Sequence, residues 1–209
     1  MGPHQLRNGA CRLAPIDWAK AATYAEHIEK PWYACQSLAW LGRYSPPPIS
    51  EQFIDRAFRK AEAGKDAYQH LAAAAWPLRA LVELGQIEQA EQAFDRISGQ
   101  AAGVTPPSSR SEACLLVYQA IVVANEQTGL RALRWLLSAS QPTEHWRQER
   151  AVCDAIVIAI SIGLVDRNHA LTLVHDEKQR TQIIRRLDRG EVSHPRSFFW
   201  EEGLSDHLP

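Results

Sequence analysis

The stretch LVELGQIEQAEQAFDRIS, residues 81–98, decides the fold class of this chain. Apolar residues recur every three or four positions on both sides of Gly85, which is the spacing of a helix with one buried face. Glycine commonly ends helices because it adopts positive φ without steric cost. One helix is therefore expected to end at Gly85 and a second to begin within two residues. So short a connection predicts that the two helices pack antiparallel.

The same helical spacing continues through most of the sequence, whereas strand signals are nearly absent. Asp17 and Asp66 are predicted N-caps, and Pro31 is predicted at the first position of a helix. Ser50 and Thr143 are predicted to cap two further helices. These patterns predict an all-α fold.

Two landmarks recur along the chain and suggest a degenerate repeat. Each predicted turn carries a glycine and is followed by a helix with an alanine near its start. The turns and alanines are Gly85, Gly129 and Gly163 with Ala90, Ala132 and Ala170. The alanines are 42 and 38 residues apart, which is within the range of helical-hairpin repeats.

Residues 85–97, GQIEQAEQAFDRI, resemble the turn and second helix of a tetratricopeptide-type repeat. The resemblance implies that Gly85 makes the turn, that Ala90 lets the paired helices approach closely, and that Phe94 and Ile97 fill the layer behind. The preceding helix lacks that family's Trp-Leu-Gly-Tyr spacing, so the resemblance supports an α-α superhelix in general. The segment is also similar to the second helix of a pentatricopeptide repeat, whose RNA code needs tandem copies.

We therefore predict a right-handed α-α superhelix of about five antiparallel helical hairpins, forming one domain over residues 1–209. Residues 1–16 are expected to be an N-terminal segment, residues 17–189 the helical repeats, and residues 190–209 a tail or cap. Pro77 is expected to kink one continuous helix. The alternative is that Pro77 lies in the first turn of a separate short helix.

Composition limits the function classes. The chain has 209 residues, of which 45% are hydrophobic and 22% charged, and its net charge of -1 provides no global basic field for nucleic acid. Its longest apolar run, residues 151–163, is too short to span a bilayer, which takes about 20 residues, so no membrane association is expected. The cysteines are far apart in sequence and are expected to be buried in a reducing compartment, the cytoplasm. They are Cys11, Cys35, Cys114 and Cys153.

No catalytic, cofactor-binding or metal-binding residue is predicted, and we do not expect an enzyme. His145 and Glu149 have the spacing of half a metal site, but no further ligands are identifiable. The pair His175 and Asp176 would need matching residues on other helices to form a phosphohydrolase site. Asp154, within an apolar run, is expected to form a helical ion pair with Arg150 four residues earlier.

Aromatic and basic residues are the candidates for partner binding. Seven tryptophans are many for this length. Those at 32, 40, 76 and 135 follow helix patterns and are expected in the core. The remaining candidates are Trp18, Trp146, Arg180, Arg185, Phe198, Phe199 and Trp200. The adjacent aromatic residues near the C-terminus are expected to cap the open end of the superhelix, or to dock onto another chain, including a second copy.

Stacked helical hairpins form a concave surface, and proteins of this architecture commonly hold a peptide or protein partner. By analogy of fold, we expect a protein-interaction module. A self-associating protein, with a homodimer formed through the aromatic tail, is the first alternative. A nucleic-acid binder, for which the basic residues of segment 177–189 would serve, or an enzyme built on helical repeats is the second.

Overall fold

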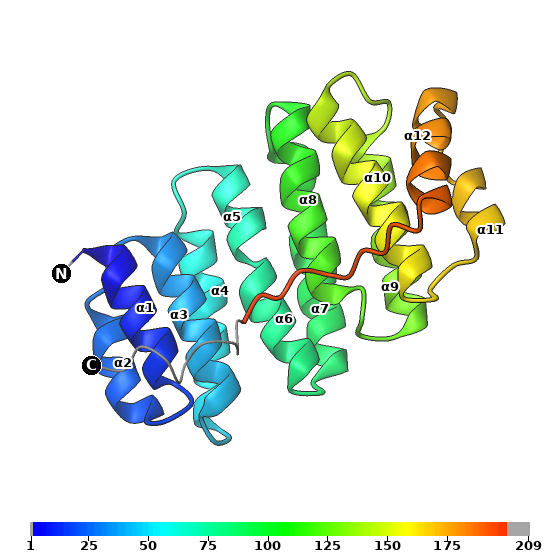
Figure 1. Ribbon diagram of the computed structural model, residues 1–209. Coiled ribbons are helices and arrows are strands. Elements are labelled where there is room, and N and C mark those ends of the chain that lie inside the picture. Colours follow the sequence, from blue (N-terminus) through cyan, green and yellow to red (C-terminus); the bar gives the residue numbers. More distant parts are fainter. Residues whose placement is uncertain (1, 200–209) are drawn as a thin grey trace.

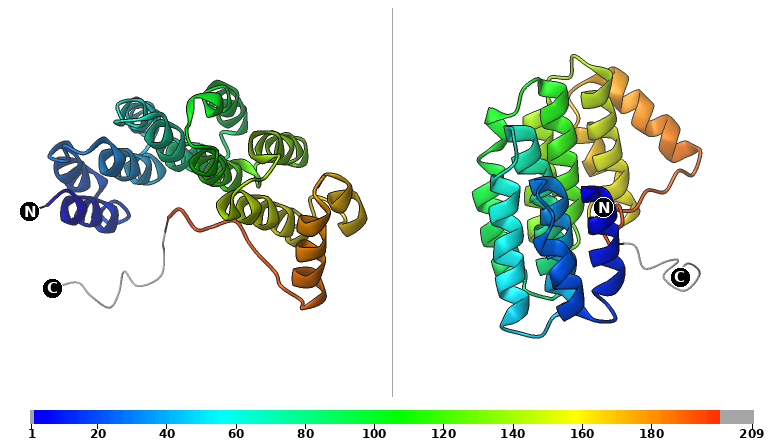
Figure 2. Two further views of the ribbon diagram at one scale, coloured as in Figure 1. Left: turned by 90° about the horizontal axis from the view of Figure 1, so that it is seen from above. Right: turned by 90° about the vertical axis from the view of Figure 1, so that its left-hand side faces the viewer.

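The computed structural model describes residues 2–199, in which helices are the only regular secondary structure. The predicted all-α fold is therefore confirmed. The helices stand side by side in two layers that follow an arc (Figures 1 and 2). The inner, concave layer contains α1 (Pro3–Leu13), α3 (Pro31–Tyr44), α5 (Ala67–Ala73), α6 (Ala75–Glu83), α8 (Pro107–Ile121), α10 (Trp146–Ser161) and α12 (Glu177–Asp188). The outer layer contains α2 (Trp18–Glu26), α4 (Ile49–Glu62), α7 (Ile87–Ser98), α9 (Glu126–Ser140) and α11 (Arg167–Thr172).

The helix ends follow the polar and glycine residues of the sequence. Asp17 and Asp66 cap α2 and α5, because their carboxylates accept hydrogen bonds from the backbone N–H groups three residues later, at 2.9 and 2.8 Å. Gly85 and Gly163 have φ of 71° and 73°, as the predicted sharp turns require. Gly190 has φ of 72° and ends α12 in the same way.

Small residues lie where the two layers meet. Ala90, Ala132 and Ala170 are completely buried, and Phe94 and Ile97 are buried beside the first of them. Alanine at such a position lets two helix backbones approach closely, while the larger side chains fill the remaining space. The core thus runs continuously between the layers from α1 to α12.

Pro77 lies in the first turn of a separate helix, α6, and not within one kinked helix. The chain leaves the α-helical pattern at Ala74, between α5 and α6. Because proline has no N–H group, Pro77 cannot donate to the carbonyl of Ala73 four residues earlier. The thiol of Cys35 donates to that carbonyl instead, at 3.3 Å. A side chain of α3 thus replaces the missing helical hydrogen bond.

Two predicted caps are wrong. α4 begins at Ile49 with Pro48 at the N-cap position, and the Ser50 hydroxyl donates to the carbonyl of Gly42 in the preceding helix. α10 is capped by His145, whose Nδ1 accepts a hydrogen bond from the N–H group of Arg147, and not by Thr143. Ser50 is close to the start of α4, but its hydroxyl serves a contact with the preceding helix. Thr143 lies before the first turn of α10.

The predicted turn at Gly129 is also wrong. Asn125 caps α9, and its side chain accepts a hydrogen bond from the N–H group of Thr128. Gly129 therefore lies inside the first turn of α9. A Cβ atom there would be only 2.8 Å from the carbonyl oxygen of Val122. This glycine permits close packing and does not end a helix.

The N-terminal segment contains a helix that the sequence analysis did not predict. α1 covers Pro3–Leu13, with Pro3 at its first position, and packs against α2 and α3. Ala10 and Cys11 are completely buried in that contact. Residues 2–16 therefore form part of the start of the array and do not merely precede it.

Candidate partner-binding groove

An aromatic cluster forms the concave face near the N-terminal half of the array. Trp32 and Trp40 belong to α3, and Trp76 belongs to the neighbouring α6. The rings of Trp32 and Trp76 meet edge to face with centroids 5.6 Å apart, and Trp40 stacks on Tyr44 at 6.0 Å. Such contacts fix ring orientations beyond what apolar burial alone achieves. The cluster is therefore an ordered aromatic surface on the inner layer.

Residues 191–199, which we name the C-terminal tail segment, lie along this concave face. After α12 the chain reverses and crosses α10, α8 and α6 toward α3 (Figures 1 and 2). Its side chains alternate at the start, since residues 191, 193 and 195 are half-buried while Val192 and His194 are exposed. Alternation with a period of two is the pattern of an extended chain that lies on a surface.

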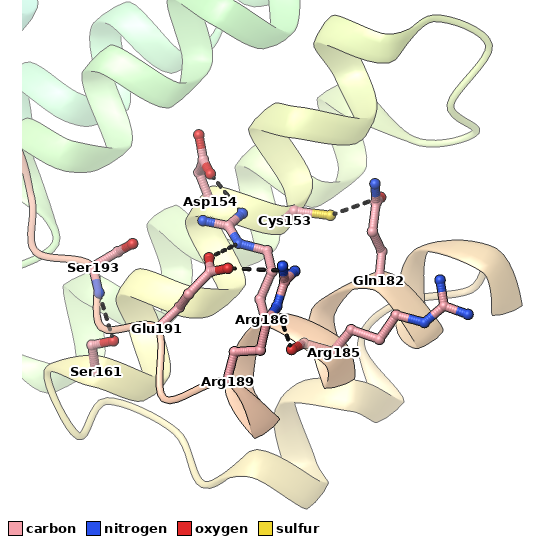
Figure 3. Close-up of polar contacts among 9 residues, drawn as sticks. All are labelled: Cys153, Asp154, Ser161, Gln182, Arg185, Arg186, Arg189, Glu191 and Ser193. Carbon is pink, nitrogen blue, oxygen red and sulfur yellow. Dashed lines mark hydrogen bonds and ion pairs between the residues drawn. The ribbon is translucent and has the colours of Figure 1, made fainter.

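Two main-chain amides attach the tail segment to side chains of the inner helices. The N–H group of Ser193 donates to the hydroxyl of Ser161 in α10 at 3.1 Å (Figure 3). The N–H group of Arg196 donates to Oε1 of Gln119 in α8 at 3.2 Å. Because these bonds use the main chain of the tail segment, they hold an extended backbone whatever its side chains.

Phe198 and Phe199 are buried in the aromatic cluster. Phe198 meets Trp76 edge to face at 5.3 Å, and Phe199 meets Trp40 in the same way at 5.4 Å. The guanidinium of Arg43 lies over the Phe199 ring at 4.5 Å from its centroid. The two phenylalanines are only 2% and 4% exposed. Both rings therefore belong to the same core cluster as the inner helices.

This position differs from the predicted cap of the open end. The adjacent rings lie on the concave face, on α3 and α6, and not on the free side of the last helix. A bend after Ser197, whose hydroxyl donates to the carbonyl of Phe199 at 2.6 Å, lets both neighbouring rings turn inward. Strict extended geometry would have pointed them to opposite sides.

Arg186 in α12 holds the start of the tail segment. Its guanidinium contacts the carboxylate of Asp154 in α10 at 2.8 Å and that of Glu191 at 2.7 Å (Figure 3). Burial alone would lower the pKa of Arg186, but the hydrogen bonds and charges of the two carboxylates raise it above its ordinary value. Arg186 is therefore always cationic and joins α10, α12 and the tail segment.

The predicted ion pair between Asp154 and Arg150 does not form. Arg150 instead contacts Glu112 of α8 at 2.9 Å, while Asp154 contacts Arg186. Both residues of α10 thus pair with a neighbouring helix of the inner layer. The spacing of four residues would allow an ion pair within α10. Each of the two residues pairs instead with a residue of another helix.

Two hollows lie between helices of the inner layer, and the larger one also borders the tail segment. The larger, of about 560 Å³, lies between α5, α8, α10 and the tail segment; its lining includes Tyr68, Leu116 and Arg150. The smaller, of about 260 Å³, lies between α10 and α12 and is lined by Trp146 and Cys153 among others. Trp146 is 57% exposed, an unusual degree for so large an apolar side chain. The tail segment therefore covers only part of the concave face.

The other predicted partner-binding residues are scattered. Trp18 is half-buried in α2 of the outer layer, where its ring meets that of Phe53 at 6.4 Å. Arg180 and Arg185 are exposed on α12. Trp200 lies outside the described residues. Of the predicted partner-binding residues within 2–199, Phe198 and Phe199 are the pair that meets in the groove.

The groove residues that the sequence analysis missed come from different helices. Trp40 and Trp76 were expected in the core, and they are buried, but one side of each ring faces the tail segment. Gln119 and Ser161 carry no local sequence signal, because their role depends on a chain segment that is distant in sequence. Arg186 belongs to the basic segment 177–189 that was considered for nucleic acid, and the structure pairs it with Asp154 and Glu191. The sequence signal that pointed to this groove was the pair of adjacent phenylalanines.

Reactive and metal-binding chemistry is sparse in residues 2–199. The cysteines are buried, and burial raises the pKa of Cys153 to about 11 and that of Cys11 to about 12, so the thiolate form is disfavoured. In this range no cluster of three or more His, Cys, Asp or Glu residues could hold a metal ion. Nor does any helix there have the length and apolar character needed to span a bilayer.

Comparison with known proteins returned no significant match, whether to a protein family, to a curated protein or to a solved structure.

Proposed function

We propose that this protein is a cytoplasmic protein-interaction module that holds a peptide or protein partner in its concave groove and catalyses no reaction. In this proposal the two layers of helices are a right-handed α-α superhelix of about five degenerate, tetratricopeptide-like helical hairpins. Helical-repeat proteins of this kind bind extended partners on their concave side.

One observation carries the proposal: an extended segment of chain already lies in the groove. The tail segment is held by main-chain amides at Ser193 and Arg196 and by two buried aromatic side chains. The groove therefore has the groups that an extended peptide needs, namely acceptors for backbone amides and an apolar surface for side chains. The open hollow of about 560 Å³ beside it offers further area for a partner.

The charges of α12 support a protein partner over nucleic acid. Arg186 and Arg189 contact the carboxylate of Glu191, and Arg167 of α11 contacts Asp188. Each such pair neutralises a cation that could otherwise bind phosphate.

The alternative is a self-associated form in which two copies exchange their tail segments. The exposure of the start of the tail segment favours this alternative.

A position-specific cross-linking experiment tests the proposal. A photo-reactive amino acid would replace Leu116 in the groove or, as the control, the exposed Glu88 on the outer helix α7. After irradiation in a lysate of the native host, we expect one protein to be joined at position 116 and not at position 88. The product should resist nuclease and persist when the salt concentration is raised.

Two results would contradict the proposal. Nuclease-sensitive adducts at position 116 that weaken with salt would indicate nucleic acid. Adducts that contain only a second copy of the chain would indicate self-association.

A further inference from the structure

The tail segment makes contacts of two kinds, and they have different implications for recognition. The amides of Ser193 and Arg196 donate to Ser161 and Gln119, and any extended peptide except one with proline at those positions can repeat these bonds. Side-chain contacts, by contrast, occur at few positions. Recognition of sequence must therefore come from the side chains.

Glu191 binds Arg186 at the α12 end of the tail segment, whereas three side chains contact the aromatic cluster. Phe198 and Phe199 bury their rings against Trp76 and Trp40. The guanidinium of Arg196 lies over the rings of Trp76 and Phe198, at 5.5 and 5.4 Å from their centroids. A cation over an aromatic face is attracted by the ring quadrupole. The groove thus accepts an arginine followed, after one residue, by two adjacent aromatic residues.

The tail segment shares no backbone ladder with the helices. Within the described chain, residues 192–199 form no hydrogen bond from main chain to main chain. Val192 is 66% exposed, and His194 is exposed as well. A segment without a shared backbone ladder, whose burial depends on two side chains, belongs to the low-stability part of a fold. Its release would leave an aromatic surface, formed by Trp40 and Trp76, without a cover.

We propose that this surface is a docking site for an extended segment of a partner protein that carries an arginine, one spacer residue and two adjacent aromatic residues. The tail segment, with Arg196, Phe198 and Phe199, is the resident ligand that such a partner must displace. This inference rests on the proposed interaction function and names the chemistry of its ligand. Because the resident ligand is covalently attached, it competes at a high effective concentration, which is in the millimolar range for short flexible links.

The test uses the full chain and a labelled peptide with the sequence of residues 191–199, amidated at its C-terminus. In the variant Phe198→Ala/Phe199→Ala the resident ligand is weakened while the groove is intact. We expect this variant to bind the peptide at least about tenfold more tightly than the wild-type chain does. The same peptide with both phenylalanines replaced by alanine is the matched control and should not bind. Circular dichroism and thermal unfolding would establish that the variant is folded.

A second variant retains both phenylalanines and keeps the proposal testable if the first one does not fold. The variant Arg196→Ala removes an exposed guanidinium that lies over the rings of Trp76 and Phe198, so it weakens the resident ligand without emptying the core. We expect it to bind the peptide about two- to fivefold more tightly than the wild-type chain does, because it loses an exposed cation–π contact.

Binding by the folded Arg196→Ala variant that equals binding by the wild type would overturn the inference. Binding by the folded Phe198→Ala/Phe199→Ala variant that equals binding by the wild type would also overturn it. These outcomes are separate from the cross-linking at position 116. If a partner cross-linked at position 116 lacks the aromatic pair, the proposed interaction function still stands. Only the proposed chemistry of its ligand is then wrong.

Discussion

At the scale of single residues, Arg186 is the cation on which the start of the tail segment depends. The variant Arg186→Met keeps the length of the side chain but leaves Asp154 and Glu191 without their shared partner. We expect a loss of about 1–2 kcal/mol in the free energy of unfolding, because a half-buried carboxylate loses a charge-assisted hydrogen bond. Urea denaturation measures this loss. Arg189→Met is the control, since Arg189 is 69% exposed and should change stability little.

The buried thiols predict how stability depends on pH. Burial raises the pKa of Cys153 from 9.0 to about 11, and the other cysteines shift in the same direction. Above pH 9 the unfolded chain therefore holds fewer protons than the folded chain. Below pH 9 the buried, protonated thiols should contribute fully to the free energy of unfolding. As the pH rises toward 11, this stabilising contribution should be lost. Urea unfolding at pH 7, 9 and 10.5 would check this, and a contribution from Cys153 is ruled out if Cys153→Ala has the same dependence.

At the scale of the helices, two glycines with different surroundings should respond oppositely to alanine. At Gly129 in α9 a Cβ atom would lie 2.8 Å from the backbone oxygen of Val122, so Gly129→Ala should destabilise the protein by about 1–3 kcal/mol. At Gly9 in α1 the nearest atom, in Tyr24, would be at an ordinary 3.4 Å. Gly9→Ala should therefore stabilise by roughly 0.5–1 kcal/mol. Thermal and urea unfolding of the two variants would measure both signs, and destabilisation by both would refute the assignment.

The glycines also explain how far the sequence could predict the elements. Caps at Asp17 and Asp66 and the turn at Gly85 were predictable, because each depends on residues within one helical turn. Gly129 was not, since a glycine that ends a helix and one that permits close packing look alike without the neighbouring chain. The groove has the same limit: the adjacent phenylalanines attract attention in the sequence, whereas Gln119 and Ser161 matter only where a distant segment crosses them.

At the scale of the whole molecule, docking of the tail segment can be followed by limited trypsin digestion. Arg196 offers a cleavage site that the docked segment holds against Trp76. Phe198→Ala/Phe199→Ala should speed cleavage after Arg196 by about tenfold or more, because it raises the population of the undocked state. Mass spectrometry at early times would identify the products. If cleavage within the helices accelerates equally, the variant loosens the fold as a whole.

The tail segment has a further consequence because of where its two ends are attached. Glu191 is bound to α12, at one end of the arc, and Phe199 packs on Trp40 of α3, toward the other. Even fully extended, the residues between these attachments reach no more than about 30 Å. The tail segment therefore acts as a tie across the chord of the arc and limits how far the stack of helices can straighten. A ligand that replaces it without joining the same two ends would release this limit, so the curvature of the array would depend on which segment occupies the groove.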